Sequence, residues 1–573
     1  MAPHMDLHPI DQAIVAAYCA LSIAIGFLLA RRAKGSIRDF FLSGSTLPWW
    51  VIGTSMIATT FAADTPLLVT GIVRTQGIWG NWLIWAVALM HVLAVVLFSK
   101  FWRRVGVLTD QELVEIRYSG RPARILRLVK AGYLATLYNL IVIGWVVSAM
   151  ASILETTTGM ERWLSVVVCV SVAAVYSVLS GFWGVVATDV IQFGIAMVAS
   201  IVLAFLAVSE VGGMESMIER LGPERLSMLP VPPEGVSVFS LDFWTSPFGN
   251  VLLLVIFLWW GSQNSDGGGM IIQRMLAAKD ERHARAGTLW FALGHYAIRF
   301  WPWVVVGVAS ILLVESESLK KPGDAYPEMV NLLLPVGLKG IMIAAFFAAF
   351  MSTIDTHVNW GASYLVNDVY RRFLKPTESD RHYVTVSRIV VLALTVCGAG
   401  ASFAIGTLHG AFLLVISMGM GIGSVLILRW FWWRINAWSE LSALLTSIVL
   451  GLAFEIFGLL EGPEKALRLA IIAPVSVAVW VTVTFLTSPV PKETLREFYR
   501  RARPGGWWGP VVGKETSGVR WGLVFVEYFA ALALVLGATF GIGCLVFLQT
   551  AEGVVLLGVA AAGAGVLAWR WRD

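Results

Sequence analysis

The sequence predicts an all-α polytopic membrane protein, and three observations support this fold class. Hydrophobic residues make up 57% of the 573 positions and charged residues only 14%, whereas soluble domains average about 45–50% and about 25%. About fifteen apolar stretches approach the roughly 20 residues that a membrane-spanning helix requires. Two of these stretches are interrupted near their middle by polar residues, proline or glycine. We therefore expect most of the chain to lie within a lipid bilayer.

The first interrupted stretch runs from about Leu47 to Val73 and holds Asp64 and Pro66 near its middle. Pro66 cannot donate to the helical hydrogen-bond ladder and disfavours helical geometry at the residue before it. A charged group at the bilayer centre costs on the order of 3 kcal/mol, and broken backbone is tolerated there only where protein or water surrounds it. We therefore expect a discontinuous helix that lines a site. A simple kink, with Asp64 reaching toward an interface, is the alternative.

The second interrupted stretch is apolar over residues 251–261, breaks at SQNSDGGG (262–269) and resumes toward Arg274. With the first span set aside, each interrupted stretch opens a group of five spans, residues 36–208 and 247–434. The first group enters the membrane from the cytoplasm and the second from outside, so their topologies are opposite. Interrupted helices at matching positions of inverted halves are typical of a secondary transporter whose site lies at mid-membrane.

The remaining segments frame these two repeats. Lys and Arg cluster in loops on one predicted side of the membrane, as in cytoplasmic loops, which places the N-terminus outside and the C-terminus in the cytoplasm of a multi-pass plasma-membrane protein. The expected partners are the bilayer and a small solute, with no nucleic acid; the oligomeric state stays open. The segments are an extra N-terminal helix (1–35), an extracellular loop (209–246) and C-terminal helices (435–573) that include a basic amphipathic segment near 491–505.

Small and hydroxylated residues mark one face of the span from 337 to 370. At helical spacing Ala349, Ser352 and Thr353 share this face and offer one backbone carbonyl and two hydroxyls. Uncharged oxygens of this kind suit a weakly held hard cation such as sodium. Free carbonyls near Ala58 and Phe61 would complete an all-oxygen shell if the first broken helix packs against this face. The alternative, which composition alone favours, is that both hydroxyls bond back to their own helix.

Short segments distributed over residues 36–372 resemble the sodium:solute symporter family, also called the sodium/glucose cotransporter family. They occur in the family's order and together are quite specific. The long SQNSDGGG stretch resembles a less-studied branch of that family. The matching segments are FFLSG (40–44) with LPWW (47–50), ATDVIQF (187–193), QRMLAAK (273–279), AFMST (349–353) and DVYRR (368–372).

This resemblance implies a LeuT-type five-plus-five inverted repeat with one extra N-terminal and about four extra C-terminal transmembrane helices. It also implies alternating access, with Na+ as the coupling ion and the only metal. Thr353 replaces the more usual serine and keeps the hydroxyl. The family's sodium site maps onto the carbonyls of Ala58, Phe61 and Ala349 and the hydroxyls of Ser352 and Thr353.

Two further acids are candidates for a second cation or an ion pathway. Asp189 corresponds to an aspartate that in some family members lies on the sodium exit path or helps to hold a second ion, although near a span's end it could simply be solvated. Asp355 is unusual for the family and could assist a cation, bind a basic group or titrate. Arg299 and His295 share a later span. For Arg299 the sequence leaves open a pairing with Asp266 or Asp355 and a position at the interface.

The region expected to bind solute departs from the sugar-transporting relatives, so a glucose-type pocket cannot be carried over. Two carboxylates near the breaks favour a hydroxylated or cationic organic solute. Most of the 26 tryptophans are expected in interfacial belts, but two of them could stack against a solute. The candidate lining residues are Asp64, Thr65, Asn264 and Asp266, with Trp82 and Trp85 as stacking faces.

The leading hypothesis is a sodium-coupled symporter that carries a small polar organic solute into the cell. A proton-coupled symporter of the same fold, using Asp355 or Asp189, is the nearer alternative. A membrane enzyme or a solute sensor is the more distant one. The eight histidines are scattered without a His-x-x-x-His or His-Glu-x-x-His run, and the tail from residue 491 holds no signalling domain. We therefore expect neither catalytic residues nor enzyme activity.

Overall fold

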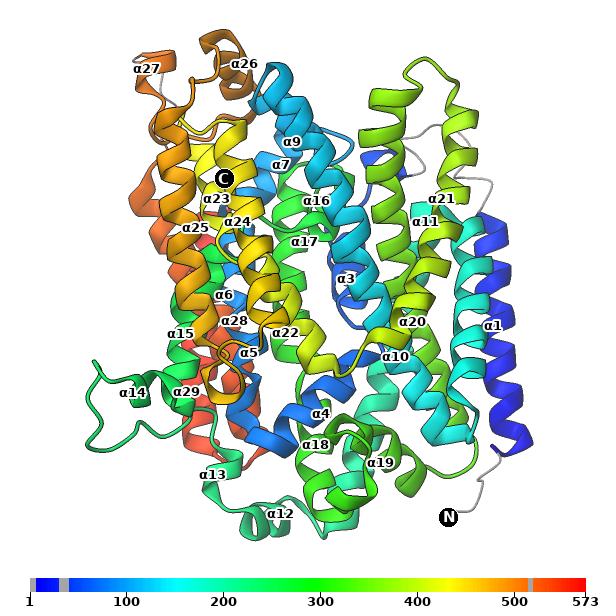
Figure 1. Cartoon of the computed structure of the whole chain (residues 1–573). Helices are drawn as coiled ribbons and strands as arrows, with labels where there is room; N and C mark the ends of the chain where they lie inside the picture. The colour runs from blue at the N-terminus through cyan, green and yellow to red at the C-terminus, as the bar shows by residue number, and fades with distance from the viewer. Residues whose placement is uncertain (1–6, 30–40, 514–518, 573) are drawn as a thin grey trace.

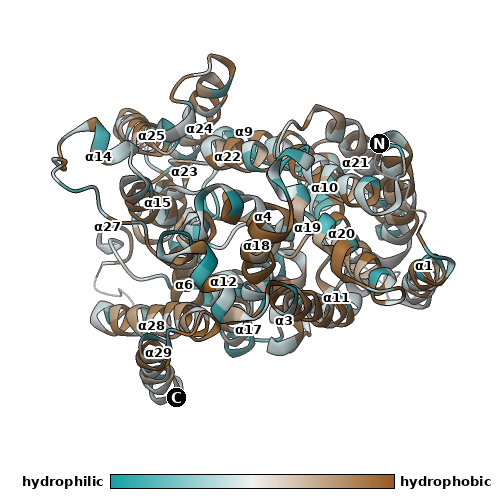
Figure 2. Ribbon diagram, turned by 90° about the horizontal axis from the view of Figure 1, so that it is seen from below, coloured by the Kyte–Doolittle hydropathy of each residue, from teal (hydrophilic) through white to brown (hydrophobic). Residues whose placement is uncertain are grey.

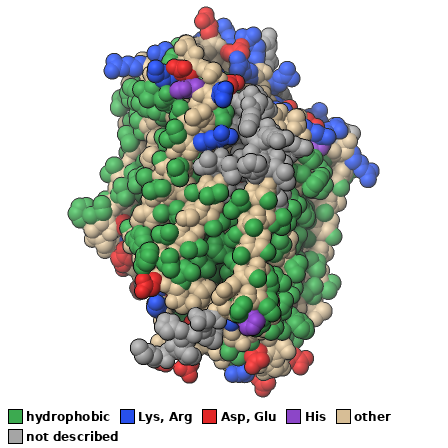
Figure 3. All heavy atoms as spheres, turned by 90° about the vertical axis from the view of Figure 1, so that its right-hand side faces the viewer, with side chains coloured by type: hydrophobic (Ala, Val, Ile, Leu, Met, Phe, Trp, Pro, Cys, Tyr) green, Lys and Arg blue, Asp and Glu red, His purple; other side chains and the backbone are tan. Residues whose placement is uncertain are grey.

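The computed structural model describes residues 7–29, 41–513 and 519–572. Phe40 of the first matching segment lies outside them, as do parts of the predicted N-terminal helix segment. The described chain forms one bundle of roughly parallel and antiparallel helices without a β-strand (Figure 1). On the face drawn in Figure 3, charged side chains of both signs gather at the two ends, with Lys and Arg most abundant at the upper end and a hydrophobic band between the ends. This distribution agrees with a chain that crosses a membrane.

The first half of the bundle contains an N-terminal helix followed by the helices of the first predicted repeat. Three short helices then lead to the second repeat at the lower end of the molecule (Figure 1). The bounds are α1 (Pro9–Leu29), α3 (Trp49–Thr59), α4 (Asp64–Gln76), α5 (Trp82–Trp85), α6 (Ala88–Leu93), α7 (Ser99–Val105), α8 (Glu112–Arg117), α9 (Gly120–Tyr133), α10 (Asn139–Thr158), α11 (Arg162–Val211), α12 (Met214–Leu221), α13 (Pro223–Leu226) and α14 (Leu241–Thr245).

The second half holds the second predicted repeat and the C-terminal helices. Its bounds are α15 (Pro247–Gly261), α16 (Gly269–Ala277), α17 (Glu281–Leu293), α18 (Trp301–Leu313), α19 (Ala325–Leu333), α20 (Leu338–Ser363), α21 (Asp380–Ala401), α22 (Leu408–Met418), α23 (Ile422–Phe431), α24 (Ala437–Ile456), α25 (Leu467–Leu486), α26 (Lys492–Ala502), α27 (Gly509–Val512), α28 (Trp521–Val546) and α29 (Thr550–Arg570). Seen from below, α4 and α18 lie at the centre of the bundle and α1 and α29 at its periphery (Figure 2).

The first predicted interruption is confirmed. Helix α3 ends at Thr59, α4 begins at Asp64, and the two axes differ by 58°. Pro66 lies in the first turn of α4, where a missing backbone N–H leaves no intrahelical bond unmade. The Thr65 hydroxyl accepts a hydrogen bond from the backbone N–H of Ala62 at 3.3 Å and so satisfies one donor of the break.

The second predicted interruption is confirmed as well, between the end of α15 at Gly261 and the start of α16 at Gly269. The chain turns there through Gly267 and Gly268, whose φ angles of 128° and 75° favour glycine. A third interruption, between α22 and α23, was not predicted. At this point the backbone N–H of Gly421 donates to the carbonyl of Gly261 at 2.6 Å, so the second and third interruptions contact each other.

Among the described residues, ten helices are long and apolar enough to cross a membrane, and the bent pair α3–α4 raises the number to eleven. The predicted total of about fifteen is reached only when shorter apolar helices are included. These are α1, the first part of α11 (162–175), and the interrupted pairs α15–α16 and α22–α23, each pair taken as one span.

The span that contains α20 is the most deeply buried of the candidate membrane spans in the described residues. In its most apolar window 94% of the residues are buried, compared with 22% for α29. Asp11 of α1 is buried and accepts hydrogen bonds from the backbone N–H groups of Gly337 and Gly340, both at 2.7 Å. An acid at this position satisfies unpaired donors at the start of α20 and complements the helix dipole. The extra N-terminal helix therefore anchors α20.

The basic amphipathic segment forms α26 at the upper end of the molecule (Figure 1). Its apolar residues Leu495 and Phe498 are buried against the protein rather than left for lipid. The guanidinium of Arg117 lies 5.3 Å from the ring centre of Phe498 and 5.0 Å from that of Trp508. The apolar face of α26 thus closes one end of the bundle, while its basic residues lie on the outer side.

Candidate functional site

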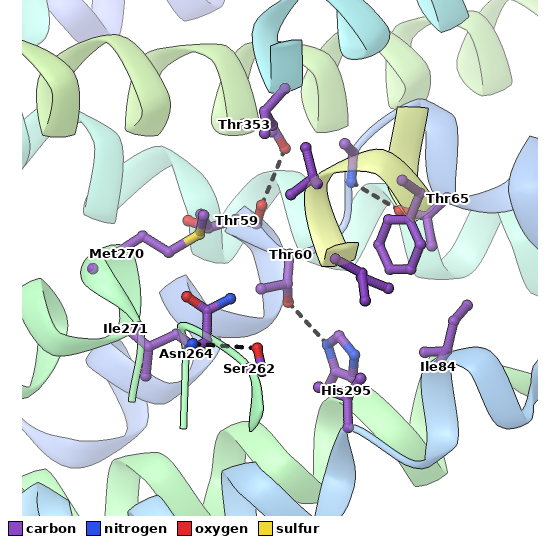
Figure 4. A pocket seen from close by; sticks show the side chains of 18 of the residues that line it. Thr59, Thr60, Thr65, Ile84, Ser262, Asn264, Met270, Ile271, His295 and Thr353 are labelled. Atoms are coloured by element: carbon purple, nitrogen blue, oxygen red, sulfur yellow. Dashed lines mark hydrogen bonds between the residues drawn. The ribbon is translucent and has the colours of Figure 1, made fainter. Parts of the chain in front are cut away.

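A cavity of about 260 Å³ lies beside the break between α3 and α4. Residues of α6, α10, the α15–α16 connection, α20 and α22 form its remaining walls. Figure 4 shows polar side chains of the two interrupted helices, among them Thr60 and Asn264, together with Thr353 of α20 around this space. Both predicted interruptions therefore border the same cavity.

The hydroxyl of Thr353 contacts the unwound backbone between α3 and α4. Its Oγ1 donates to the carbonyl of Thr59 at 3.2 Å and lies 3.5 Å from the carbonyl of Phe61 (Figure 4). The Ala58 carbonyl accepts the backbone N–H of Phe61 at 2.9 Å, and Ala349 is buried one helical turn before Thr353. Of the two predicted hydroxyls, that of Thr353 contacts the first break and so does not bond only to its own helix.

Ser352 donates its hydroxyl to Asp189 of α11 instead of to the break. The Ser352 Oγ to Asp189 Oδ1 distance is 2.5 Å, and Ser55 Oγ donates to the other carboxylate oxygen, also at 2.5 Å. Asp189 and Ser55 are fully buried. The carboxylate therefore connects α3, α11 and α20 beside the oxygens expected to hold sodium.

Arg274 of α16 supplies the positive charge of this network. Its Nη2 lies 3.7 Å from Asp189 Oδ2 and donates to the hydroxyls of Thr59 and Thr356 at 2.6 and 2.9 Å, while its Nε donates to Ser55 at 3.0 Å. A buried charge is tolerated when it is paired and hydrogen-bonded. Arg274 thereby links the second interrupted helix to the end of α3. Sequence reasoning counted this residue among the basic residues of the cytoplasmic loops and in a family motif, whereas in the structure it is fully buried.

A second arginine, Arg299, also contacts the unwound segment between α3 and α4. Its Nη1 donates to the carbonyl of Ile57 and its Nη2 to the carbonyl of Thr60, both at 2.6 Å. His295 Nδ1 lies 3.0 Å from the Thr60 hydroxyl (Figure 4). The sequence left three positions open for Arg299. In the structure it caps the C-terminal carbonyls of α3 and forms no ion pair with Asp266 or Asp355.

The predicted solute residues fall into three groups. Asp64, Thr65 and Asn264 line the cavity. The Asp266 carboxylate instead accepts hydrogen bonds from Arg429 at 2.6 Å and Trp430 at 3.2 Å and borders a smaller cavity next to the main one. Neither predicted tryptophan reaches the main cavity: Trp85 is fully buried among other aromatic rings and Trp82 donates its indole N–H to the Met228 carbonyl at 2.9 Å.

Other aromatic residues take the place of those two tryptophans. Trp145, Trp360 and Tyr138 line the cavity, and Trp145 faces Phe412 with ring centres 6.0 Å apart. No sequence signal distinguished these rings, because each lies in an apolar helix that also packs against its neighbours. The second proposed cation residue, Asp355, lies fully buried on α20 and accepts a hydrogen bond from Asn359 at 2.8 Å.

The chemistry available at this site is ion and solute binding. The groups near the break are carbonyls, hydroxyls and a few charged side chains, and among the described residues there is no group of three or more His, Cys, Asp or Glu side chains that could hold a metal ion. Oxygens without formal charge form a suitable shell for a hard monovalent cation. The cavity beside them can accommodate a compact organic molecule.

Comparisons with known proteins agree with this geometry. The sequence model of the Sodium:solute symporter family matches residues 40–447. The chain is 25% identical over 535 residues to sodium/glucose cotransporter 4 of Danio rerio, covering 85% of this chain and 80% of the relative. It is 26% identical over 471 residues to the sodium/glucose cotransporter of Vibrio parahaemolyticus, covering 78% and 86% of the two chains.

Among solved structures, a Na+-coupled sialic acid symporter in a substrate-bound outward-open state is similar in fold. The TM-score is 0.71 at 20% sequence identity, and the match covers 84% of this chain and 98% of the symporter. At this level of identity the likeness concerns the fold alone. It supports the LeuT-type arrangement predicted for the two groups of five spans.

Proposed function

This chain belongs to the sodium:solute symporter family, and from that premise we propose that it carries a small polar organic solute into the cell by alternating access. It is a multi-pass membrane transporter, not an enzyme, and sodium is its coupling ion. The identity of the solute, the residues that bind it and the direction of transport belong to the proposal.

The contact between Thr353 and the break carries the proposed sodium site. The Thr353 hydroxyl of α20 lies 3.2 and 3.5 Å from the carbonyl oxygens of Thr59 and Phe61, so it is next to backbone oxygens that could bind an ion. We assign the ion to the carbonyls of Ala58, Phe61 and Ala349 and the hydroxyls of Ser352 and Thr353. Sodium at this point would hold α20 against the first interrupted helix and favour one state of the transporter over the other. Coupling requires such differential affinity between states.

Asp189 is proposed to act next to this site. Its carboxylate already holds Ser352, one of the proposed ligands, at 2.5 Å. An ion that draws the Ser352 hydroxyl toward itself would have to compete with Asp189, so the acid would set the affinity of the site or receive the ion on release. Asp355, one turn after Ser352 on the same helix, is the other acid proposed for a second ion or an ion pathway.

The proposed orientation has the N-terminus outside and the C-terminus in the cytoplasm of the plasma membrane. Helix α1 begins at the lower end of the molecule, while α26 with its basic residues lies at the upper end (Figure 1). Cytoplasmic loops are enriched in Lys and Arg, which supports the upper end as the cytoplasmic one. Uptake is then movement from the lower to the upper end.

Thermal unfolding of the purified protein in sodium chloride and in potassium chloride of equal ionic strength tests the ion site. A ligand that binds only the folded state stabilises it by about 2.7 kcal/mol at a concentration of 100 times Kd. We expect sodium to raise the midpoint and the Thr353→Ala variant to lose most of that response. Thr353→Ser keeps the hydroxyl and serves as the matched control. An unchanged sodium response in a Ser352→Ala/Thr353→Ala double variant would rule out this site.

Transport itself is tested in proteoliposomes with labelled solutes and separate sodium and proton gradients. Uptake driven by a sodium gradient at equal pH agrees with the proposal. Uptake driven by a pH gradient without sodium would favour the proton-coupled alternative, with Asp189 or Asp355 as the titrating acid.

A further inference from the structure

The main cavity contains an acidic oxygen that has no hydrogen-bond donor. Asp64 is the first residue of α4, lines the cavity and is only 8% exposed. Its Oδ1 is buried and accepts no hydrogen bond from any of the described residues. A buried carboxylate oxygen is costly to leave unpaired. The position therefore calls for a donor from outside the chain.

Neighbouring side chains do not donate to this oxygen. Arg299 borders the same cavity, but its two terminal nitrogens donate to the carbonyls of Ile57 and Thr60, and its Nε has no acceptor among the described residues. The Thr65 hydroxyl accepts the N–H of Ala62 and does not bond to Asp64 Oδ1. A second acceptor on the cavity, Oε1 of Gln263, is also buried without a donor among the described residues. The cavity thus holds two acceptors that lack a donor.

Apolar side chains form much of the remaining cavity wall, although polar ones such as His91 and His357 also line it. The rings of Trp145 and Phe412 are tilted against each other with their centres 6.0 Å apart. A sugar ring presents hydroxyls on most of its edges, and those that lie against the apolar residues would stay without partners. The apolar part of the wall suits a solute with an apolar body instead. The residues of this apolar wall are Leu68, Val142, Trp145, Phe412, Val415 and Ile416.

We propose that the transported solute is a compact organic amine whose protonated primary or secondary nitrogen donates to Asp64 and whose apolar body lies against Trp145 and Phe412. This inference rests on the proposed function, since it names the solute class for the same cavity. The positive charge complements the carboxylate, and N–H groups supply the missing donors; charge-assisted hydrogen bonds of this type are the stronger ones. A quaternary ammonium has the charge but no N–H, and an alcohol has a donor but no charge.

Binding is measured as the shift in the thermal unfolding midpoint of the purified full chain, in sodium and in potassium. The probes are phenethylamine, its trimethylated quaternary derivative, phenethyl alcohol and glucose. We expect phenethylamine to stabilise the protein in sodium, with half-saturation at a concentration at least about tenfold lower than for the other three. Asp64→Asn should weaken the amine response by on the order of tenfold or more while keeping the sodium response. Asp242→Asn, at an exposed acid of α14, is the matched control and should respond as wild type.

Each remaining outcome contradicts the proposal in a distinguishable way. Equal or stronger stabilisation by the alcohol, the quaternary ion or glucose would overturn the solute class but leave the sodium site in place. Loss of the sodium response in Asp64→Asn would assign Asp64 to the ion instead. The absence of any sodium response in wild type would overturn the proposed sodium site itself. An amine response that survives Asp64→Asn would show that the nitrogen binds elsewhere.

Discussion

Arg299 Nη2 lies 2.6 Å from the carbonyl oxygen of Thr60, and Nη1 of the same guanidinium lies 2.6 Å from the carbonyl of Ile57. The first half of the broken helix, α3, thus ends on a cation that belongs to the second predicted repeat. The last carbonyls of a helix have no intrahelical partner, and a positive charge at that end also complements the helix dipole. Arg299 occupies these two oxygens, while the carbonyls of Thr59 and Phe61 lie within 3.5 Å of the Thr353 hydroxyl.

Replacing Arg299 by Gln should therefore disturb the ion site without touching its proposed ligands. Hydrogen bonds to charged groups are worth about 1.5–3 kcal/mol each, so we expect a lower unfolding midpoint and at least a tenfold weaker sodium half-saturation. Arg299→Lys keeps the charge but loses the planar guanidinium that donates to both carbonyls. Its unfolding midpoint and its sodium half-saturation should lie between those of wild type and Arg299→Gln. Sodium-dependent thermal unfolding measures both effects. A sodium half-saturation equal to that of wild type in Arg299→Gln would show that the capping contact does not position the ion's ligands.

Asp189 joins three helices and faces Arg274. We therefore expect its removal to lower the free energy of unfolding much more than removal of Ser55, which donates to it. Asp189→Ala leaves the buried guanidinium without its counter-charge, which costs about 3–5 kcal/mol when one partner of a buried pair is removed. Ser55→Ala removes only one donor to the carboxylate and should cost about 1 kcal/mol. Denaturant unfolding, in a detergent that supports reversible unfolding, distinguishes them. Equal losses in the two variants would indicate that the charge on Asp189 is not compensated by Arg274.

A buried ion cluster lies next to the cavity, near the end of the molecule that carries α26. Asp266 pairs with Arg429 at 2.6 Å, Arg429 with Glu440 at 3.1 Å, and Glu440 with Lys130 at 2.5 Å. It borders the smaller cavity, which shares Asn264 with the main one. Helices α9, α23 and α24 and the α15–α16 connection are held together by these contacts.

Neutralising one member of this cluster should favour opening at the α26 end, which we propose to be cytoplasmic. Asp266→Asn removes the charge opposite Arg429. We therefore expect a cysteine introduced at Asn264 to react faster with a thiol reagent added on the α26 side of the membrane. The Asn264→Cys variant without the second change gives the reference rate. A rate that stays at the reference value would show that the cluster only stabilises the fold.

The two interruptions at the site were predictable because each left a local mark on the sequence. Pro66 follows Asp64 in the first, and consecutive glycines with an acid mark the second. The α22–α23 interruption was missed although Gly419, Gly421 and Gly423 mark it, since glycine is also common where membrane helices pack closely. Its role became clear only from the long-range contact of Gly421 with Gly261.

The site was predictable where it depends on one helix face and not where it depends on which helices meet. Spacing alone predicted that Ser352 and Thr353 share one side of α20, but only Thr353 contacts carbonyls of the break, while Ser352 bonds to Asp189. Periodicity cannot tell which tryptophan of an apolar helix faces a cavity, so Trp82 and Trp85 were chosen and Trp145 and Trp360 were not. In the same way, the charge of Arg299 was evident but its partners, backbone carbonyls about 240 residues away, left no signal.

Gly268 offers a last test of how the second interruption shapes the cavity. A side chain there meets two obstacles: φ is +75°, which L-residues rarely adopt, and an added Cβ would lie 2.7 Å from Asn264 Oδ1. Gly222 has nearly the same φ, +74°, with nothing within 4 Å of an added Cβ. Both Gly→Ala changes should cost about 1 kcal/mol for the backbone, but only Gly268→Ala should displace Asn264 and weaken solute binding. The thermal-shift response to the amine probe, compared between the two variants, separates backbone strain from displacement of Asn264. An equal response in both variants would show that Asn264 is not part of the solute site.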